Sequence, residues 1–273
     1  MRPFVALDTA TDHIAVAIGD LDRPGEVVAA EDFQAPRAAN TVVLLAIERL
    51  LQSAGLGPAD IAAVVCGRGP GSFTGVRIGV TTAKGLAHGR VVPLVGVGTL
   101  DAVAHRLRET ADGLVGVLGD AMRGEVYPAL FRVRAGLVER SDPDRVSAPL
   151  QVAEEWATLG EPVSLTGNGL AKHGSLFGQV MGSRAREVPV RLWTPDGASL
   201  IGAAWATDGP GSLRSIAMMA RAEAYAAAHP AALLPVYTRL SDAEEAERQR
   251  FAGASADGVG VPAAGVAGPE GSS

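Results

Sequence analysis

The sequence predicts an α/β protein built from two related halves, each a mixed sheet with covering helices. Residues 4–18 show an apolar strand that ends at Asp8, a polar turn and a second strand, and residues 114–133 repeat this plan around Asp120. A glycine-rich loop at 67–79 joins an apolar run to a helical segment. With 273 residues, 47% of them hydrophobic and 20% charged, the chain is long enough for two ordinary domains.

The first half is expected to alternate strands and helices after an opening hairpin. The helix at 39–53, closed by Gly55, has an apolar stripe wider than the roughly 100° that a surface helix needs. Either its own domain buries the whole stripe, or part of it packs on another chain. We expect strands at 4–7, 14–18, 27–33, 61–66 and 91–97, and helices at 39–53, 76–88 and 99–109.

The second half is expected to begin near Gly113. The tail at 252–273 is rich in Gly, Ala, Ser and Pro and should be disordered. The expected division is therefore 1–110, 111–251 and 252–273. We expect strands at 114–119, 125–133 and 162–166, a turn at Gly167-Asn168-Gly169, and helical segments at 151–158, 198–207 and 213–228.

The glycine loop reads G-R-G-P-G-S-F-T-G-V-R-I-G. It lacks the spacing of a dinucleotide fingerprint, of a Walker A loop and of a nucleophile elbow. Glycine permits close backbone approach, so the loop either contacts a ligand or forms a tight strand-to-helix turn. The candidate ligand contacts are Gly69, Gly71, Ser72, Thr74 and Gly75.

The loop resembles the signature of the TsaB (YeaZ) family, bacterial partner subunits for making threonylcarbamoyladenosine on tRNA. Two halves that each open with strand, Asp, turn and strand also resemble the actin, sugar-kinase and Hsp70-ATPase (ASKHA) architecture. In those folds the first turn holds a nucleotide phosphate, which makes Asp8 and Thr9 a candidate phosphate turn. Further family marks are Leu44-Leu45, residues 120–127, Gly167-Asn168-Gly169 and residues 235–239, whereas Asn40-Thr41 and the 201–216 region depart from the family pattern.

Metal chemistry is not expected. The catalytic relatives of the TsaD/Kae1 family carry Gly-Val-x-His-x-x-x-His, and here Thr99 and Val103 stand in the two histidine positions. We therefore predict neither a metal nor another cofactor. Asp8 and Asp120 are either an acid/base pair or two turn caps, and we favour the caps. Cys66 lies in an apolar run and reads as an inert buried thiol.

The resemblance implies a non-catalytic partner subunit of the complex that forms threonylcarbamoyladenosine on tRNAs reading ANN codons. It would bind a TsaD-type transferase directly and a TsaE-type ATPase within the complex, and would form a homodimer when alone. We predict that the partner docks on two helices through Val42, Leu45, Ala46, Arg49, Val76, Gly79, Val80 and Ala83.

Charge and targeting signals agree with that role. A net charge of −6 argues against a chain that grips tRNA by itself, so tRNA contact is expected only through the complex. No secretory signal or membrane span is evident, and we expect a cytoplasmic protein. The alternatives are a small-molecule kinase of the same fold class and, less favoured, a glycoprotease-like metallopeptidase.

Overall fold

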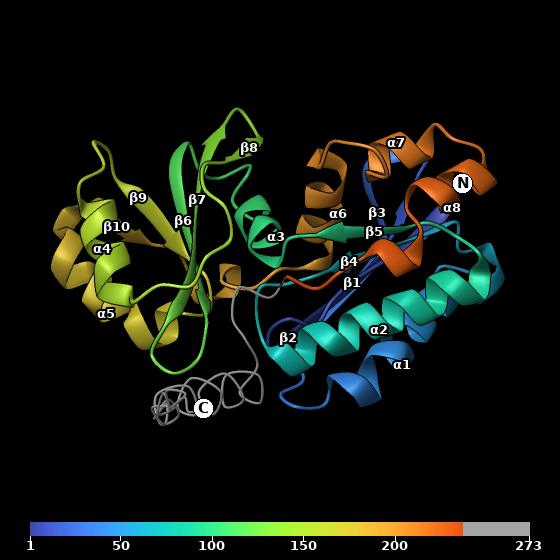
Figure 1. The fold of residues 1–273 in the computed structure, drawn as a ribbon, viewed down its shortest axis with the longest axis horizontal. Coiled ribbons are helices and arrows are strands. Elements are labelled where there is room, and N and C mark those ends of the chain that lie inside the picture. Colours follow the sequence, from blue (N-terminus) through green and yellow to red (C-terminus); the bar gives the residue numbers. More distant parts are fainter. Residues whose placement is uncertain (237–273) are drawn as a thin grey trace, which may run out of the picture. The chain divides into compact units, whose positions relative to one another are not determined.

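The fold contains two sheets with the same strand order. The computed structural model describes residues 1–236, so the expectations for 252–273 and for most of 235–239 lie outside the described residues. The first sheet has the order β3-β2-β1-β4-β5 and the second the order β10-β9-β6-β7-β8 (Figure 1). The strands are β1 (Pro3–Asp8), β2 (His13–Asp20), β3 (Arg23–Gln34), β4 (Ala63–Gly67), β5 (Leu94–Val97), β6 (Gly113–Asp120), β7 (Val126–Arg134), β8 (Leu137–Arg140), β9 (Val163–Thr166) and β10 (Ala185–Glu187).

The pairing pattern is also duplicated. In the first sheet β1 runs antiparallel to β2 and parallel to β4, and in the second sheet β6 runs antiparallel to β7 and parallel to β9. The internal repeat predicted from the two strand–Asp–turn–strand segments is thus present. This topology is that of a duplicated ASKHA-type α/β fold, as predicted.

Helices cover both sheets. Ser72 caps the second helix, because its Oγ accepts the backbone N–H of Gly75 at 3.3 Å. The helices are α1 (Ala39–Ser53), α2 (Phe73–Arg90), α3 (Thr99–His105), α4 (Pro149–Ala157), α5 (Leu170–Met181), α6 (Gly197–Ala206), α7 (Leu213–Ala217) and α8 (Arg221–Ala227), with short 3-10 turns η1 (Pro58–Asp60), η2 (Gly182–Arg184), η3 (Val190–Leu192) and η4 (Pro230–Ala232).

The strands alternate their buried side chains between two layers, as the period of a strand requires. On β1, Val5 and Leu7 pack toward α1 and α2, whereas Phe4 and Ala6 pack toward α6, α7 and α8. In the second half α4 and α5 cover one face of the sheet and α3 the other. The helix that follows each sheet therefore covers the opposite sheet, and a division at residue 110, which remains a proposal, separates α6 from the sheet that it covers.

Several elements differ from the expected bounds. The strand expected at 91–97 begins only at Leu94, because Val91 has a left-handed φ of 53° at the end of α2. The helix expected at 99–109 ends at His105, and the segment 213–228 holds two short helices. Strands β8 and β10 and helix α5 were not predicted. No helix in residues 1–236 is long and apolar enough to span a bilayer.

Candidate functional site

The glycine loop packs against the turn between β1 and β2. A Cβ atom on Gly71 would lie 2.4 Å from the carbonyl oxygen of Ala10, and one on Gly75 would lie 2.1 Å from that of Thr9. A Cβ on Gly79 would lie 2.5 Å from Thr9 Oγ1. These glycines are therefore needed for close packing within the chain, because any larger residue would push α2 away from the first sheet.

The side chain of Asp8 holds this arrangement from within the core. It is fully buried, and its two oxygens accept the Ala10 N–H at 2.8 Å and the Thr99 hydroxyl at 2.7 Å. Thr99 Oγ1 in turn accepts the N–H of Gly69 at 3.2 Å. Burial raises the pKa of the Asp8 carboxyl, and the two hydrogen bonds offset part of that rise. Asp8 thus ties the first turn to the glycine loop and to α3.

Three residues near Asp8 and α3, namely Thr99, Val103 and Cys66, also serve contacts within the chain. Thr99 stands in the first histidine position of the TsaD pattern, and its hydroxyl donates a hydrogen bond to Asp8. Val103, in the second histidine position, lies in the core between α3 and the second sheet. Cys66 is completely buried, and desolvation raises its thiol pKa, which fits the inert thiol predicted from the sequence. Residues 1–236 contain no group of three or more His, Cys, Asp or Glu placed to bind a metal ion.

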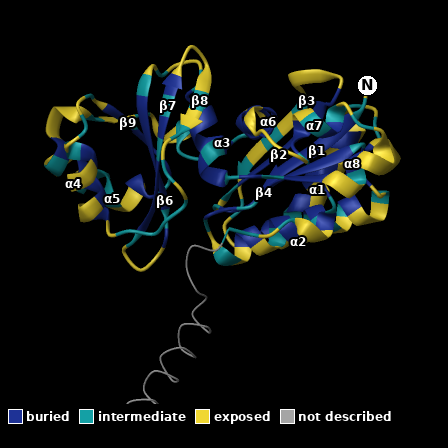
Figure 2. Ribbon diagram, turned by 45° about the horizontal axis from the view of Figure 1, so that its top comes forward, coloured by how far each residue is buried: buried dark blue, intermediate teal, exposed yellow. Residues whose placement is uncertain are grey.

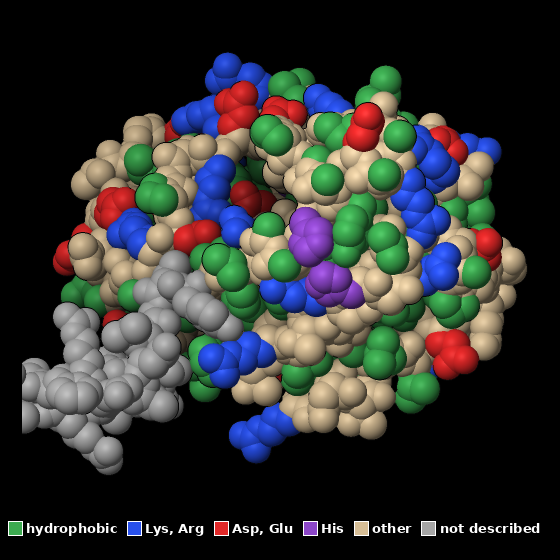
Figure 3. All heavy atoms as spheres, turned by 45° about the vertical axis from the view of Figure 1, so that its right-hand side comes forward, with side chains coloured by type: hydrophobic (Ala, Val, Ile, Leu, Met, Phe, Trp, Pro, Cys, Tyr) green, Lys and Arg blue, Asp and Glu red, His purple; other side chains and the backbone are tan. Residues whose placement is uncertain are grey.

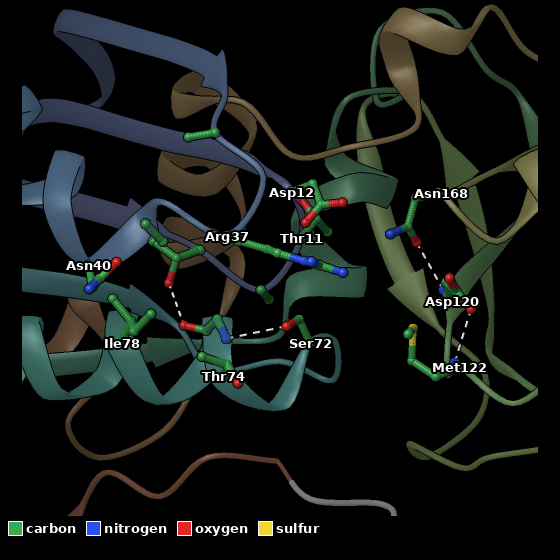
Figure 4. Close-up of a pocket in the computed structure, with 15 residues that line it drawn as sticks. Thr11, Asp12, Arg37, Asn40, Ser72, Thr74, Ile78, Asp120, Met122 and Asn168 are labelled. Atoms are coloured by element: carbon green, nitrogen blue, oxygen red, sulfur yellow. Dashed lines mark hydrogen bonds between the residues drawn. The ribbon is translucent and has the colours of Figure 1, made fainter.

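A cleft of about 780 Å³ opens where the first turn, the starts of α1 and α2, and the turn after β6 meet (Figure 4). Of the five loop residues predicted to contact a ligand, Ser72, Thr74 and Gly75 line it, whereas Gly69 does not and Gly71 lines only a smaller crevice. The residues around the cleft are Thr9, Ala10, Thr11, Asp12, Ala35, Arg37, Ala39, Asn40, Ser72, Thr74, Gly75, Ile78, Asp120, Met122 and Asn168.

The two residues of the candidate phosphate turn, Asp8 and Thr9, differ in whether they reach the cleft. Thr9 lines the cleft and Asp8 does not. Across the cleft, Asp120 accepts the N–H of Met122 at 2.9 Å and forms an ion pair with Lys172 at 2.5 Å. Only one member of the postulated Asp8–Asp120 pair therefore faces the cleft, which fits the turn-cap interpretation. Sequence reasoning missed Arg37, which lies at the cleft between β3 and α1.

The residues predicted to dock a partner fall into two groups. Ala46, Val76, Gly79, Val80 and Ala83 are buried in the chain's own core. The expectation that Gly79 and Ala83 of α2 meet a partner is wrong, because these two small residues, the ridge of α2, face the β1–β2 turn and the core of the first half. Small residues at i and i+4 permit close approach but do not specify which partner approaches.

The remaining predicted residues lie on the outer side of α1. Leu45 is 51% exposed, Val42 is half-buried, and Arg49 is exposed in an ion pair with Glu31 at 2.6 Å. Leu44, one of the family marks but absent from the predicted interface, is 52% exposed beside them. Figure 2 shows exposed residues along the outer side of α1 and α2. We call Val42, Leu44, Leu45 and Arg49 the outer face of α1.

Comparisons with known proteins place this fold and loop in a family. The family model for TsaD, tRNA N6-adenosine threonylcarbamoyltransferase, matches residues 33–184. The chain is 32% identical over 181 residues to the Bacillus subtilis tRNA threonylcarbamoyladenosine biosynthesis protein TsaB, covering 66% of this chain and 77% of that protein. It is 37% identical over 167 residues to the Escherichia coli TsaB, covering 58% and 70%. The chain belongs to the TsaB (YeaZ) family.

Solved structures agree with this membership. A Pseudomonas aeruginosa protein described as similar to peptidase YeaZ superposes with a TM-score of 0.67 at 27% identity, over 88% of this chain and 100% of that one. Another structure, YeaZ from Pseudomonas aeruginosa, gives a TM-score of 0.64 at 28% identity, over 75% and 91%. The TsaB resemblance of the glycine loop thus extends to the two sheets and their helices.

Proposed function

We propose that this TsaB-family chain is a non-catalytic partner subunit in the formation of threonylcarbamoyladenosine on tRNA. It binds a TsaD-type transferase through the outer face of α1, and a TsaE-type ATPase joins the same complex. The observation that carries the proposal is the adjacent pair Leu44 and Leu45, each about half exposed on a helix whose other large aliphatic residues are buried or half-buried. Family membership supplies the process in which that surface acts.

The binding free energy expected from covering Leu44 and Leu45 fits a specific interface. Fully burying a leucine side chain stabilises by about 1.5–3 kcal/mol, so covering the exposed halves of two leucines contributes roughly 2 kcal/mol in all. Arg49 and its partner Glu31 border the leucines, as charged residues commonly border an apolar interface centre. Such rim charges mainly set orientation and association rate.

The proposed role keeps tRNA contact for the assembled complex. The chain carries a net charge of −6, and on the face drawn in Figure 3 the Lys and Arg side chains lie scattered among acidic and apolar ones. A protein that binds RNA by itself commonly gathers its basic residues on one face. In the absence of its partner, the same apolar face would pair with a second copy under two-fold symmetry.

The kinase alternative gains no support from the first turn. A kinase of this fold class would use that turn to hold phosphate, whereas here the Asp8 carboxylate is buried and occupies the Ala10 N–H. Formation of ADP from ATP that depends on an added candidate sugar, measured on the purified chain, would revive this alternative if it exceeded the rate of an Asp8→Ala variant.

The docking proposal is tested with matched leucines on equivalent helices of the two halves. Leu45→Asp changes the outer face of α1, and Leu150→Asp changes α4, where Leu150 is 49% exposed. Affinity for the TsaD-type protein of the same organism is measured by calorimetry, and folding by circular dichroism. We expect Leu45→Asp to weaken binding roughly tenfold or more, with an unchanged melting temperature, and Leu150→Asp to bind like wild type. A folded Leu45→Asp variant with wild-type affinity would contradict the proposal.

A further inference from the structure

The cleft beside Arg37 has the volume of a small-molecule site. At about 780 Å³ it lies within the range of roughly 300–1,000 Å³ that ligand pockets occupy. Its lining combines apolar surface from Ala35, Ile78 and Met122 with hydroxyl, amide and charged groups. Apolar walls with a few placed polar groups are typical of sites that bind an organic molecule.

Most polar groups of the first turn are already paired with one another. The Asp8 carboxylate holds the Ala10 N–H, and the Thr9 hydroxyl donates to the carbonyl of Gly75 at 2.6 Å. The N–H of Ser72 donates to the carbonyl of Ala10 at 2.7 Å. An anion that entered here would therefore find these donors occupied and would need another cationic or donor group.

Arg37 supplies such a group. In residues 1–236 its guanidinium has no hydrogen-bond or ion-pair partner, and Figure 4 shows it extending along the cleft from the α1 side toward the wall that carries Asp120 and Asn168. The amide of Asn40 and the hydroxyl of Thr74 line the same side. The planar, paired donors of a guanidinium match the oxygens of a carboxylate or phosphate.

The other charges limit what the site can take. Asp12 lies at the cleft without an ion-pair partner among the described residues, and Asp120 is paired with Lys172. One unpaired cation and one unpaired acid in the same cleft suit a single anionic group better than a polyphosphate, which would bring several negative charges near Asp12. Asp12 would instead accept a hydrogen bond from a hydroxyl or ammonium of the ligand.

We propose that the cleft binds a small organic molecule with one oxyanion head, a carboxylate or a phosphate monoester, and that Arg37 binds this head. The body of the molecule lies between Ile78 on one side of the cleft and Met122 on the other. The site does not use the donors of the first turn. Because the site is complete within this chain, it can be tested without any partner protein.

Three probes of similar size separate the contributions of charge and shape. Phenyl phosphate, benzoate and the neutral benzyl alcohol are titrated into the full chain, and dissociation constants are taken from NMR shift changes. We expect at least one of the two anions to bind roughly tenfold or more tightly than benzyl alcohol, and Arg37→Ala to remove that advantage. The anion that binds more tightly distinguishes a carboxylate head from a phosphate head.

Two further variants make the result specific. Arg191→Ala, at an exposed arginine of η3 that does not line the cleft, should bind like wild type. Arg37→Lys keeps the charge but loses the paired donors, so its anion affinity should lie between wild type and Arg37→Ala; it also decides the matter should Arg37→Ala fail to fold. The proposal is overturned if neither anion binds better than benzyl alcohol, or if the Arg37 variants bind the anions as tightly as Arg191→Ala does.

Discussion

The turns after β1 and β6 occupy equivalent places in the two halves but differ in burial. Asp8 and Thr9 are almost completely buried beneath the start of α2. The side chain of Asp120 is 17% exposed, and beyond it Met122, Arg123 and Gly124 follow one another with positive φ. Both turns line the cleft, but the first also packs beneath the start of α2, whereas the second is more exposed.

The helices after these turns follow the same contrast. In α2, Gly75 and Gly79 lie against Thr9, whereas a Cβ on Gly178 of α5 would meet no atom within 4 Å. In the second half the close packing on a strand lies before the helix, where Gly167 and Gly169 meet the backbone of Leu118. Identical topology thus carries different packing requirements. Substitutions at packed positions of the first half should have large effects and those at open positions of the second half small ones, and the four predictions below run from the largest to the smallest.

The largest contrast is expected between Ala83→Arg in α2 and Ala171→Arg in α5. Ala83 is fully buried, so an arginine there would place a charge in the core and cost about 4 kcal/mol or more. Ala171 is exposed, and the same change should alter stability by about 0.5 kcal/mol or less. Circular dichroism and urea unfolding measure both. A folded Ala83→Arg variant with near wild-type stability would mean that α2 does present its small-residue ridge outward.

The next contrast compares two glycine-to-alanine changes. Gly75→Ala forces a methyl group toward the carbonyl oxygen of Thr9, 2.1 Å from the ideal Cβ position, and should cost about 3 kcal/mol. Gly178→Ala meets open space inside a helix and should stabilise by about 0.5–1 kcal/mol. Chemical denaturation gives both values. Equal effects at the two sites would show that helix propensity, and not contact with the first turn, sets the role of Gly75.

The sequence could predict most of the strands, the repeat and the bounds of α1, because strand alternation, the Asp-ended strands and Gly55 are local signals. It could not predict which side of the molecule Gly79 and Ala83 of α2 face. Small residues at these positions would permit close packing equally on the chain's own sheet or on a helix of another protein. Strands β8 and β10 are short edge strands with charged residues, and α5 contains two internal glycines, so their patterns are weak.

The site itself depends on contacts that are distant in sequence. Thr99 meets Asp8 across 91 positions, so no local pattern indicates that the carboxyl is buried and bonded. The family resemblance pointed to Leu44-Leu45, yet only the structure shows that both are exposed while Ala46 is not. Arg37 gave no signal, since one arginine among the basic residues of an arginine-rich chain is unremarkable until its position beside a cleft is known.

A smaller effect, distinguished by its pH dependence, is expected for Asp8→Asn. Because burial raises the pKa of Asp8 in the folded chain above its usual 3.8, folding favours the protonated carboxyl. The stability contributed by Asp8 is therefore greatest at acid pH and falls as pH rises from 3.8 through the raised pKa. Asparagine does not ionise, so the stability of Asp8→Asn relative to wild type should increase over that interval.

Urea unfolding of both proteins from about pH 4 to pH 8 measures this difference. Asp120→Asn, at the equivalent turn, serves as the reference for removing an acidic group from the less buried position. A relative stability of Asp8→Asn that stayed constant or declined as pH rose would show that the hydrogen bonds from Ala10 and Thr99 outweigh the cost of burial.

The smallest effect is expected at the open turn, for Lys172→Met. The Lys172 ammonium lies 2.5 Å from Asp120, but its side chain is half exposed, and ion pairs in such positions contribute about 0–1 kcal/mol. Asp120 would keep the hydrogen bond from the Met122 N–H, so the turn should retain its conformation. Urea unfolding at low and high salt provides the measurement, because salt screens an exposed pair and should erase the difference from wild type. A loss above about 2 kcal/mol that persisted at high salt would instead mean that the second turn is as firmly built into its half as the Asp8 turn is into the first.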